Sequence, residues 1–283
     1  MDPSAILQRL VERPRVAYVL QVLDAYGKAA GGLLANGLAF AALFAVIPIA
    51  LVTLGLAGSF IGDPRIQGAI AAALIELFPP LESLITGALQ ALSTGAFATS
   101  IIGLVGLVWS VSQFYVTLDV AFSRIFSAQQ ERDPLRRTAR GFLWVAVLLG
   151  LVVAVVVAAT LATAAEALVP GELAIGLLAD VLVSIPVTIA LAIGVVGLAY
   201  RVLPPRTPRW RALVVPAIVV GVVILGLTQL FVFLAPRLVG IAALAGSLAA
   251  AFIALAWFSF TFQALLIGAA WVRVRDERAR GAG

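Results

Sequence analysis

Apolar positions dominate this chain in long runs, and short polar connections separate the runs. Three apolar stretches are each long enough to cross a membrane twice, since one helical crossing needs about 20 apolar residues. The pattern predicts an all-α membrane protein with a single polytopic domain over 1–283, in which Pro236-Arg237 turns the chain after the fifth crossing. Six transmembrane helices are expected, at residues 37–60, 98–122, 141–165, 181–200, 212–235 and 241–272.

The N-terminal segment 5–28 is polar but periodic. One apolar stripe at helical spacing is formed by Val16, Val19, Leu20 and Leu23. We interpret this segment as an interfacial helix that lies on the cytoplasmic membrane surface and leads into the first crossing.

The segment 66–92 predicts two short amphipathic helices that are broken at Pro79-Pro80. Each helix is too short to cross the membrane, so both are expected to lie near the outer membrane surface. Two interpretations stay open for this outer segment. It is either a lid or docking surface, or a scaffold that rests on the lipid.

The positive charges lie in four clusters that contain seventeen of the nineteen Lys and Arg residues. The clusters occupy 9–28, 124–140, 201–211 and 273–280. Because cytoplasmic segments carry the excess of Lys and Arg, both termini and the two middle clusters are expected in the cytoplasm. The same rule accounts for the net charge of +5, so we expect no nucleic-acid binding.

Composition excludes several classes of enzyme. Hydrophobic residues make up 63% of the chain and charged residues only 12%, against about 25% charged residues in soluble domains. The absence of His and Cys excludes disulfides, thiol chemistry, most zinc sites and a serine hydrolase with a histidine base. An intramembrane aspartyl protease needs two facing Asp residues, and only Asp119 qualifies. We therefore expect no enzyme activity, no catalytic residue, no cofactor and no metal site.

Polar side chains recur on one face of two predicted crossings. The second crossing carries Ser112, Tyr115 and Asp119, and the last crossing carries Ser259 and Gln263. Polar groups in hydrocarbon need partners or water, so these two stripes are predicted to face a shared cavity. A cavity with few charges suits an amphipathic lipid better than an ion.

Arg124 and Arg201 lie at the predicted cytoplasmic mouth of this cavity, where they could attract an anionic head group. A competing interpretation also stays open. In that account Asp119 pairs with Arg124 or Arg201 and only holds the loops together. The sequence does not separate a functional Asp119 from a structural one.

Pro48 lies inside the first predicted crossing and is expected to kink it, because proline removes a backbone hydrogen bond. The kink is either a candidate hinge or a static bend that serves packing. Both interpretations remain open.

Four groups of residues, in this order and spacing, carry a resemblance to a known family. They are Leu38-Ala39-Phe40 through Pro48, the run Leu118 to Phe126, Tyr200-Arg201-Val202-Leu203-Pro204 with Trp210, and Gly246-Ser247-Leu248 with Trp257 and Gly268-Ala269. Together they resemble the YihY/BrkB family of bacterial inner-membrane proteins, which was once mislabelled as ribonuclease BN.

The resemblance implies a multi-pass protein of the bacterial inner membrane with a role in envelope maintenance. It implies a transporter, or a transport partner, for lipid or another amphipathic molecule. The alternative is a non-transporting membrane scaffold that docks envelope proteins through its outer loop. Membrane lipids are the expected partners, together with a periplasmic or envelope protein.

Overall fold

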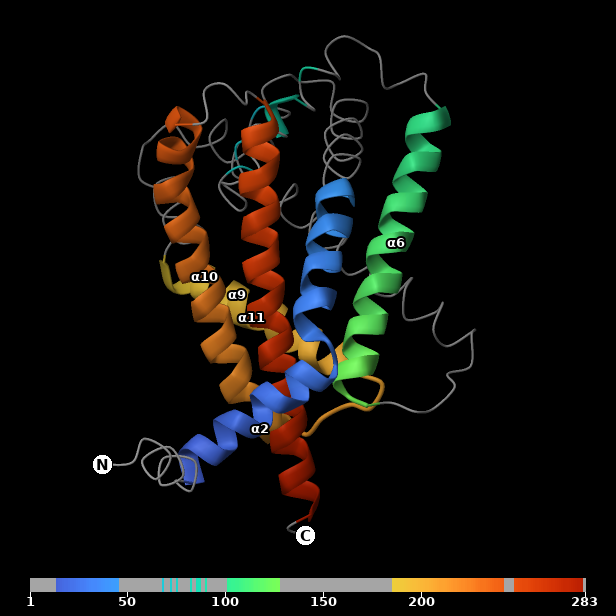
Figure 1. Ribbon diagram of the computed structural model, residues 1–283, viewed down its shortest axis with the longest axis vertical. Coiled ribbons are helices and arrows are strands. Elements are labelled where there is room, and N and C mark those ends of the chain that lie inside the picture. Colours follow the sequence, from blue (N-terminus) through green and yellow to red (C-terminus); the bar gives the residue numbers. More distant parts are fainter. Residues whose placement is uncertain are drawn as a thin grey trace, which may run out of the picture.

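The computed structural model describes residues 14–45, 101–127, 185–241 and 247–281, together with isolated positions between 68 and 90. Every regular element in these parts of the chain is a helix, which confirms the predicted all-α class there (Figure 1). The labelled helices are α2 (Pro14–Lys28), α6 (Ile101–Ile125), α9 (Ile185–Val202), α10 (Trp210–Ile241) and α11 (Ser247–Gly281), and the helix Gly31–Ala45 follows α2.

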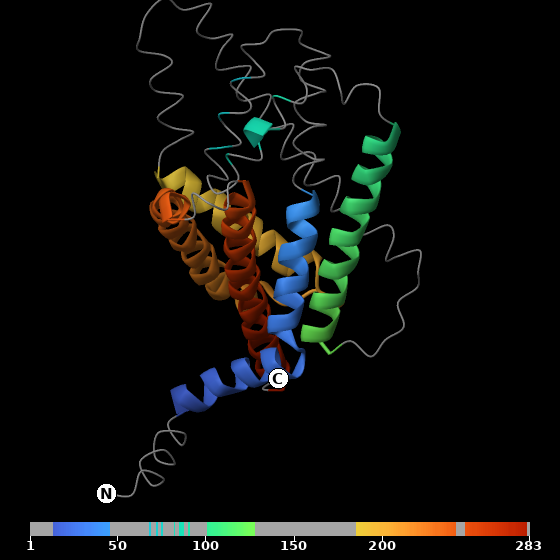
Figure 2. The same cartoon turned by 45° about the horizontal axis from the view of Figure 1, so that its top comes forward.

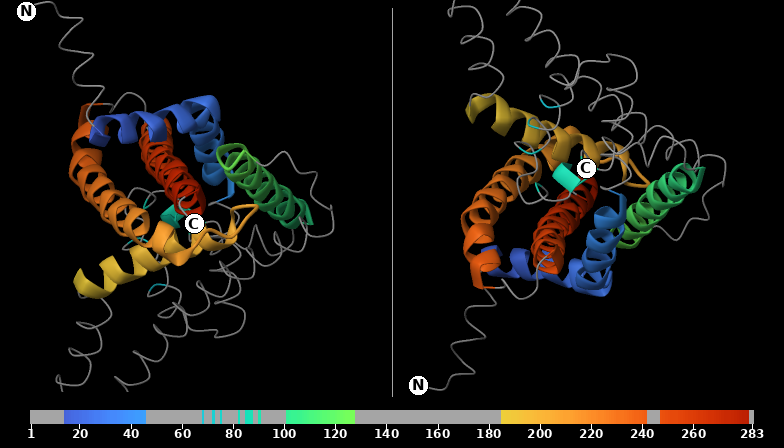
Figure 3. Two further views of the ribbon diagram at one scale, coloured as in Figure 1. Left: turned by 90° about the horizontal axis from the view of Figure 1, so that it is seen from below. Right: turned by 90° about the horizontal axis from the view of Figure 1, so that it is seen from above.

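α11 lies at the centre of the described bundle and packs against α2, α6, α9 and α10. Figure 3 shows α10 and α9 beside α11, with Gly31–Ala45 on another side and α6 next to that helix. A Cβ atom on Gly37 would lie 3.8 Å from the Thr117 methyl group, so Gly31–Ala45 and α6 face each other at this point. The last helix of the chain therefore organises the packing of the others.

Tyr200 on α9 is fully buried and joins three helices. Its hydroxyl donates to the Leu265 carbonyl on α11 at 2.9 Å, and its ring centre lies 6.5 Å from that of Phe122 on α6. A Cβ atom on Gly268 would overlap the Tyr200 hydroxyl and Val220, so this approach of α9 to α11 requires glycine. The buried hydroxyl is thereby satisfied by a backbone acceptor.

α2 and the following helix Gly31–Ala45 are bent by 59° relative to each other (Figures 1 and 2). The chain turns at Ala30, whose φ of 56° lies in the left-handed region that a Cβ atom disfavours. The Ala30 N–H donates to the Gly27 carbonyl at 2.9 Å, which closes the turn. A helix followed by a sharp turn thus occupies the segment predicted to lead into the first crossing, and residues 1–13 lie outside the described part of the chain.

Two segments are long and apolar enough to cross a membrane, Trp210–Leu234 in α10 and Ala251–Gly281 in α11. A third is counted if the bent pair Val16–Lys28 and Gly31–Ala45 is one span. This search covers only the described residues, where α9 also contains a shorter apolar helix, Ile189–Val202. The helices are those of a membrane protein, whereas the number of six crossings stays a prediction.

Several predicted features fall outside the described residues. They include the third crossing at 141–165, the candidate hinge Pro48 and the break at Pro79-Pro80. Within 66–92, the isolated positions that the structure describes are helical. These predictions therefore stay open.

The prediction that Pro236-Arg237 turns the chain is wrong, because α10 continues to Ile241. Proline inside a helix removes one backbone donor and strains the preceding turn. Here the Arg237 guanidinium donates to the Phe233 carbonyl at 2.9 Å and stacks over the Phe233 ring at 3.5 Å. Arg237 thus adds a side-chain contact to the turn around Pro236, and apolar membrane helices tolerate proline, so the helix passes through.

α11 continues past residue 272, the end of the last predicted crossing, and ends at Gly281. Its last turns are charged, and they remain helical through two pairs of opposite charge at i, i+4 spacing. Arg273 pairs with Glu277 at 2.7 Å, and Asp276 pairs with Arg280 at 2.7 Å. The final helix therefore extends beyond its apolar part.

Candidate functional site

α2 presents three different faces. Tyr18, Val22 and Ala25 pack against the bundle. Most of the predicted apolar stripe does not pack there, and these side chains are exposed: Val19 by 54%, Leu20 by 43% and Leu23 by 46%. The third face is polar and carries Gln21, Asp24 and Lys28. The helix thus has a packed face, an exposed apolar face and a polar face.

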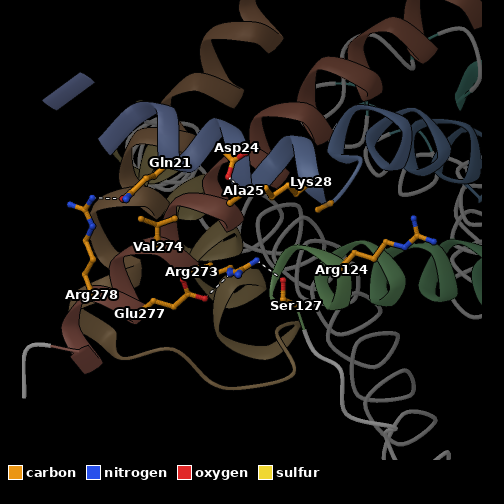
Figure 4. A pocket seen from close by; sticks show the side chains of 11 residues that line it. Gln21, Asp24, Ala25, Lys28, Arg124, Ser127, Arg273, Val274, Glu277 and Arg278 are labelled. Carbon is orange, nitrogen blue, oxygen red and sulfur yellow. Dashed lines mark hydrogen bonds and ion pairs between the residues drawn. The ribbon is translucent and has the colours of Figure 1, made fainter. Parts of the chain in front are cut away.

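The polar face of α2 forms one wall of a pocket (Figure 4). The end of α6 and the C-terminal turns of α11 form the other walls, and the cavity volume is about 480 Å³. The lining residues are Gln21, Asp24, Ala25, Lys28, Ala29, Arg124, Ser127, Arg273, Val274, Glu277 and Arg278. Four cationic side chains against two carboxylates leave this pocket with a net charge of +2.

Arg273 crosses the pocket from α11 to the end of α6. Its Nη1 atom donates to the Ile125 carbonyl and to the Ser127 hydroxyl, each at 2.7 Å, and its Nε atom lies 2.7 Å from a Glu277 carboxylate oxygen. The last carbonyls of a helix lack intrahelical donors, and cations are favoured at that end. Arg273 therefore caps α6 from a neighbouring helix.

The remaining α2 contacts are also made by side chains. Arg278 donates to the Gln21 side-chain oxygen, and its guanidinium lies over the Tyr18 ring at 4.4 Å from the ring centre. Lys28 pairs with Asp24 at 2.6 Å within α2. The two Arg278 contacts hold α2 against α11, whereas the Lys28–Asp24 pair lies within α2.

Arg124 is exposed, and in Figure 4 its side chain extends from α6 away from the other lining side chains. Among the residues that the structure describes, it forms no ion pair. Its cationic group is therefore available to a partner outside the described contacts.

Arg201, the other arginine predicted at the cavity mouth, does not line this pocket. Its guanidinium donates to the Pro208 carbonyl at 2.6 Å and lies 4.9 Å from the centre of the Trp210 ring. Arg201 thus stabilises the loop between α9 and α10. The competing interpretation, in which Asp119 pairs with Arg124 or Arg201, stays a prediction.

Asp276 caps the beginning of α10 from the side of α11. Its carboxylate accepts the Arg209 N–H at 3.0 Å and pairs with Arg280 at 2.7 Å, and only 8% of the residue is exposed. A carboxylate is favoured at a helix N-terminus, where the first N–H groups lack partners. The C-terminal turns of α11 thus cap two neighbouring helices with opposite charges.

The polar residues predicted on the second crossing become more buried from the beginning of α6 toward its end. Asp119 is buried with 6% exposure, Tyr115 is half-buried, and Ser112 is exposed. α6 and α11 meet beside this stripe, where the ring centres of Phe114 and Phe262 lie 6.0 Å apart. The cavity shared by the two stripes stays a prediction.

Ser259 and Gln263 lie together on α11, as predicted from their spacing, and a third residue joins them. The Gln263 amide lies 3.2 Å from the Ser259 hydroxyl, which lies 2.6 Å from the side-chain oxygen of Asn36 on Gly31–Ala45. The sequence reading missed Asn36. Its signal was available, since Asn36 is the only asparagine in the chain and interrupts an apolar segment.

Metal ligands are not grouped in the described part of the chain. No set of three or more Asp or Glu side chains lies close enough there to hold a metal ion. Among the described residues, Asn36, Ser259 and Gln263 offer hydrogen bonds, and the pocket offers cationic contacts.

Comparison with known proteins gives one family. The model of a family described as Virulence factor BrkB matches residues 22–283, nearly the whole chain. No curated protein and no solved structure matches the chain.

Proposed function

This chain is a membrane protein that belongs to the BrkB family, whose model spans residues 22–283, and from this membership we propose a transport function. The proposed substrate is a lipid or another amphipathic molecule, and the chain acts as the transporter or as a partner of one. The proposed location is the bacterial inner membrane, where the protein takes part in envelope maintenance.

We further propose that the pocket end of the bundle faces the cytoplasm. α2 and the C-terminal turns of α11 lie at this end, together with the loop between α9 and α10, which carries Arg206 and Arg209 (Figures 1 and 2). The cytoplasmic side of a membrane protein carries the excess of Lys and Arg. The exposed apolar face of α2 is suited to lie on the membrane surface beside it.

The hydrogen-bonded chain of Asn36, Ser259 and Gln263 is the observation that carries this proposal. It joins two apolar helices through polar groups, and Asn36 is exposed. Polar side chains in hydrocarbon are costly unless they meet partners or water. The exposed Asn36 and the neighbouring Ser259 form an uncharged polar surface, which offers hydrogen bonds to the head group of a transported lipid.

Exposed apolar side chains on the same two helices suit contact with acyl chains. Phe40 and Phe44 on Gly31–Ala45 are exposed, and so is Phe260 on α11. Such surfaces match the hydrocarbon part of an amphipathic molecule, whereas they give no coordination to an ion. In this proposal Ser112, Tyr115 and Asp119 line the same route from the side of α6.

The test is lipid movement in proteoliposomes. Fluorescent phospholipid in the inner leaflet becomes accessible to an external quencher only after it crosses the bilayer. We expect the wild-type protein to accelerate this accessibility over protein-free liposomes. Replacing Asn36→Leu together with Ser259→Ala is expected to reduce the rate several-fold, because the polar contacts of the head group are lost.

A matched control is Thr228→Val. Thr228 lies on α10 and its hydroxyl contacts the Trp257 indole N–H at 3.3 Å, so this variant also removes a polar contact between two long apolar helices. It is expected to keep the wild-type rate. Asp119→Asn removes a buried charge with little change of shape and is expected to slow lipid movement if Asp119 lines the route.

Absence of any acceleration by the wild-type protein, with liposomes of several compositions, would contradict the proposal that the chain itself transports. That outcome would favour the alternative, a scaffold that docks envelope proteins through the outer segment 66–92. If lipid moves equally fast with the wild type and with the Asn36→Leu, Ser259→Ala variant, these polar residues do not lie on the transport route.

A further inference from the structure

The pocket at the α2 end has chemistry that the proposed transport route does not use. Its walls come from three helices, and its cationic side chains outnumber its carboxylates by two. From this geometry we propose that the pocket binds a phosphate group, which is either the head group of an anionic phospholipid or a free phosphate ion.

The cations that line this pocket come from three separate helices (Figure 4). Lys28 comes from α2, Arg124 from α6, and Arg273 and Arg278 from α11. Positive-inside charge alone spreads cations along a membrane surface and needs no shared cavity. A cavity of about 480 Å³ lies within the size range of small-ligand sites, so a ligand has room between these side chains.

Several donors in the pocket are available to phosphate oxygens. A guanidinium has five N–H donors, and the described contacts of Arg273 use only its Nε and Nη1 atoms. Arg124 forms no ion pair with the described residues. Lys28 and Asp24 form a surface pair, which is weak, so Lys28 can contact a phosphate oxygen in its place.

The built part of the pocket also orients these groups. Arg273 is fixed by the Ile125 carbonyl and by Ser127, and Arg278 is fixed by Gln21. Guanidinium groups bind phosphate through paired hydrogen bonds, so a held guanidinium loses little freedom when the ligand binds.

The position of the pocket favours a lipid as the source of the phosphate. The polar face of α2 lines the pocket, while Val19, Leu20 and Leu23 on the same helix are exposed and apolar. A helix with these two faces lies in the membrane interface, at the level of the lipid head groups. Arg201, by contrast, is engaged with Pro208 and Trp210 and is no part of this site.

This inference deepens the proposed function, on which it rests for the role of the bound lipid as substrate. Its test measures binding without movement, so each can fail alone. If the protein binds phosphate but moves no lipid, the phosphate site is supported and the transport proposal is contradicted. If it moves lipid but binds no phosphate in the pocket, the transport proposal is supported and the phosphate site is contradicted.

The first arm of the experiment measures retained lipid. The full-length protein is placed in nanodiscs of phosphatidylcholine with a small fraction of phosphatidylglycerol. Native mass spectrometry then counts the phosphatidylglycerol molecules that stay bound when the protein is released from the nanodisc. The second arm titrates inorganic phosphate onto the protein in nanodiscs of phosphatidylcholine alone, and thermophoresis reports binding.

The variants are Arg124→Gln and Lys28→Gln, and the matched control is Arg206→Gln. Arg206 is an exposed cation in the loop between α9 and α10, outside the pocket lining. Each pocket variant is expected to weaken binding about fivefold, the factor for one cation near an anionic surface. The control is expected to bind like the wild type, and unfolding temperatures should be unchanged because the replaced side chains are exposed.

Retention of phosphatidylglycerol that excess inorganic phosphate does not displace would identify the lipid as the ligand. Saturable binding of inorganic phosphate without lipid retention would identify a soluble phosphate compound, and the phosphate site would still hold. Binding in neither arm would overturn the proposal. An equal loss in Arg124→Gln and Arg206→Gln would also overturn it, since surface charge alone would then explain the attraction.

Discussion

Replacing Asp276→Ala tests whether α11 stabilises α10 by capping it. Asp276 is buried, and its carboxylate accepts the Arg209 N–H at 3.0 Å at the beginning of α10. In the variant this N–H loses its acceptor, the helix end loses a favourable negative charge, and Arg280 loses its partner at 2.7 Å. The variant is therefore expected to lower the free energy of unfolding.

The magnitude follows from three contributions. Loss of a capping acceptor costs about 1 kcal/mol. Loss of the charge at the helix N-terminus costs about 0.5 kcal/mol. The pair with Arg280 is partly exposed and adds about 0.5 kcal/mol after screening. The expected total is about 2 kcal/mol, which shifts the unfolding temperature of a chain of this size downward by about 5 °C.

The assay is thermal unfolding of the purified protein in detergent, followed by tryptophan fluorescence. Trp210, one of five tryptophans in the chain, begins α10 directly after Arg209 and so lies at the affected helix end. Asp276→Asn keeps an oxygen acceptor but loses the charge, and it is expected to lose about half as much stability.

The matched control is Glu277→Ala. Glu277 is the neighbouring carboxylate, is exposed and pairs with Arg273 within α11. Loss of such an exposed i, i+4 pair costs about 0.5 kcal/mol. If Asp276→Ala destabilises the protein no more than Glu277→Ala does, the capping of α10 by Asp276 contributes nothing and the reasoning fails.

Three further predictions follow from the packing and the charge pattern. Gly268→Ala should lower the unfolding temperature by several degrees, and Tyr200→Phe should recover part of this loss in the double variant, because the added Cβ overlaps the Tyr200 hydroxyl; equal stability of Gly268→Ala and wild type would contradict the close approach. Ala30→Gly should stabilise the protein by about 1 kcal/mol in the same assay, because Ala30 has a φ of 56°, and a loss of stability would count against that turn. Single cysteines introduced as Arg136→Cys and Glu172→Cys should react with an impermeant thiol reagent from outside only at 172, and labelling at 136 alone would reverse the proposed topology.

Much of the helical framework could be predicted from the sequence, because apolar runs of membrane length need little tertiary information. The second crossing was expected at 98–122 and α6 occupies Ile101–Ile125; the fourth was expected at 181–200 and α9 occupies Ile185–Val202. The ends were less predictable. Pro236 was taken as a stop, but α10 continues to Ile241.

The candidate sites were predictable only in part. The spacing of Ser259 and Gln263 placed them on one face of a helix, and the structure brings them together. Their partner Asn36 comes from a helix more than 200 residues earlier, as the sequence separation of 223 from Ser259 indicates. Periodicity within one segment carries no information about which distant segment packs against it.

α2 separates most clearly what each level determines. The sequence by itself determined that a helix forms and that Val19, Leu20 and Leu23 share one face, because both follow from local spacing. Only the tertiary structure decided that this face stays exposed and that Val22 packs on the bundle. It also turned the polar face with Lys28 toward α11, making a pocket. The reason is physical: an apolar helix face in a membrane protein can meet either protein or lipid, and hydrophobicity alone does not distinguish them.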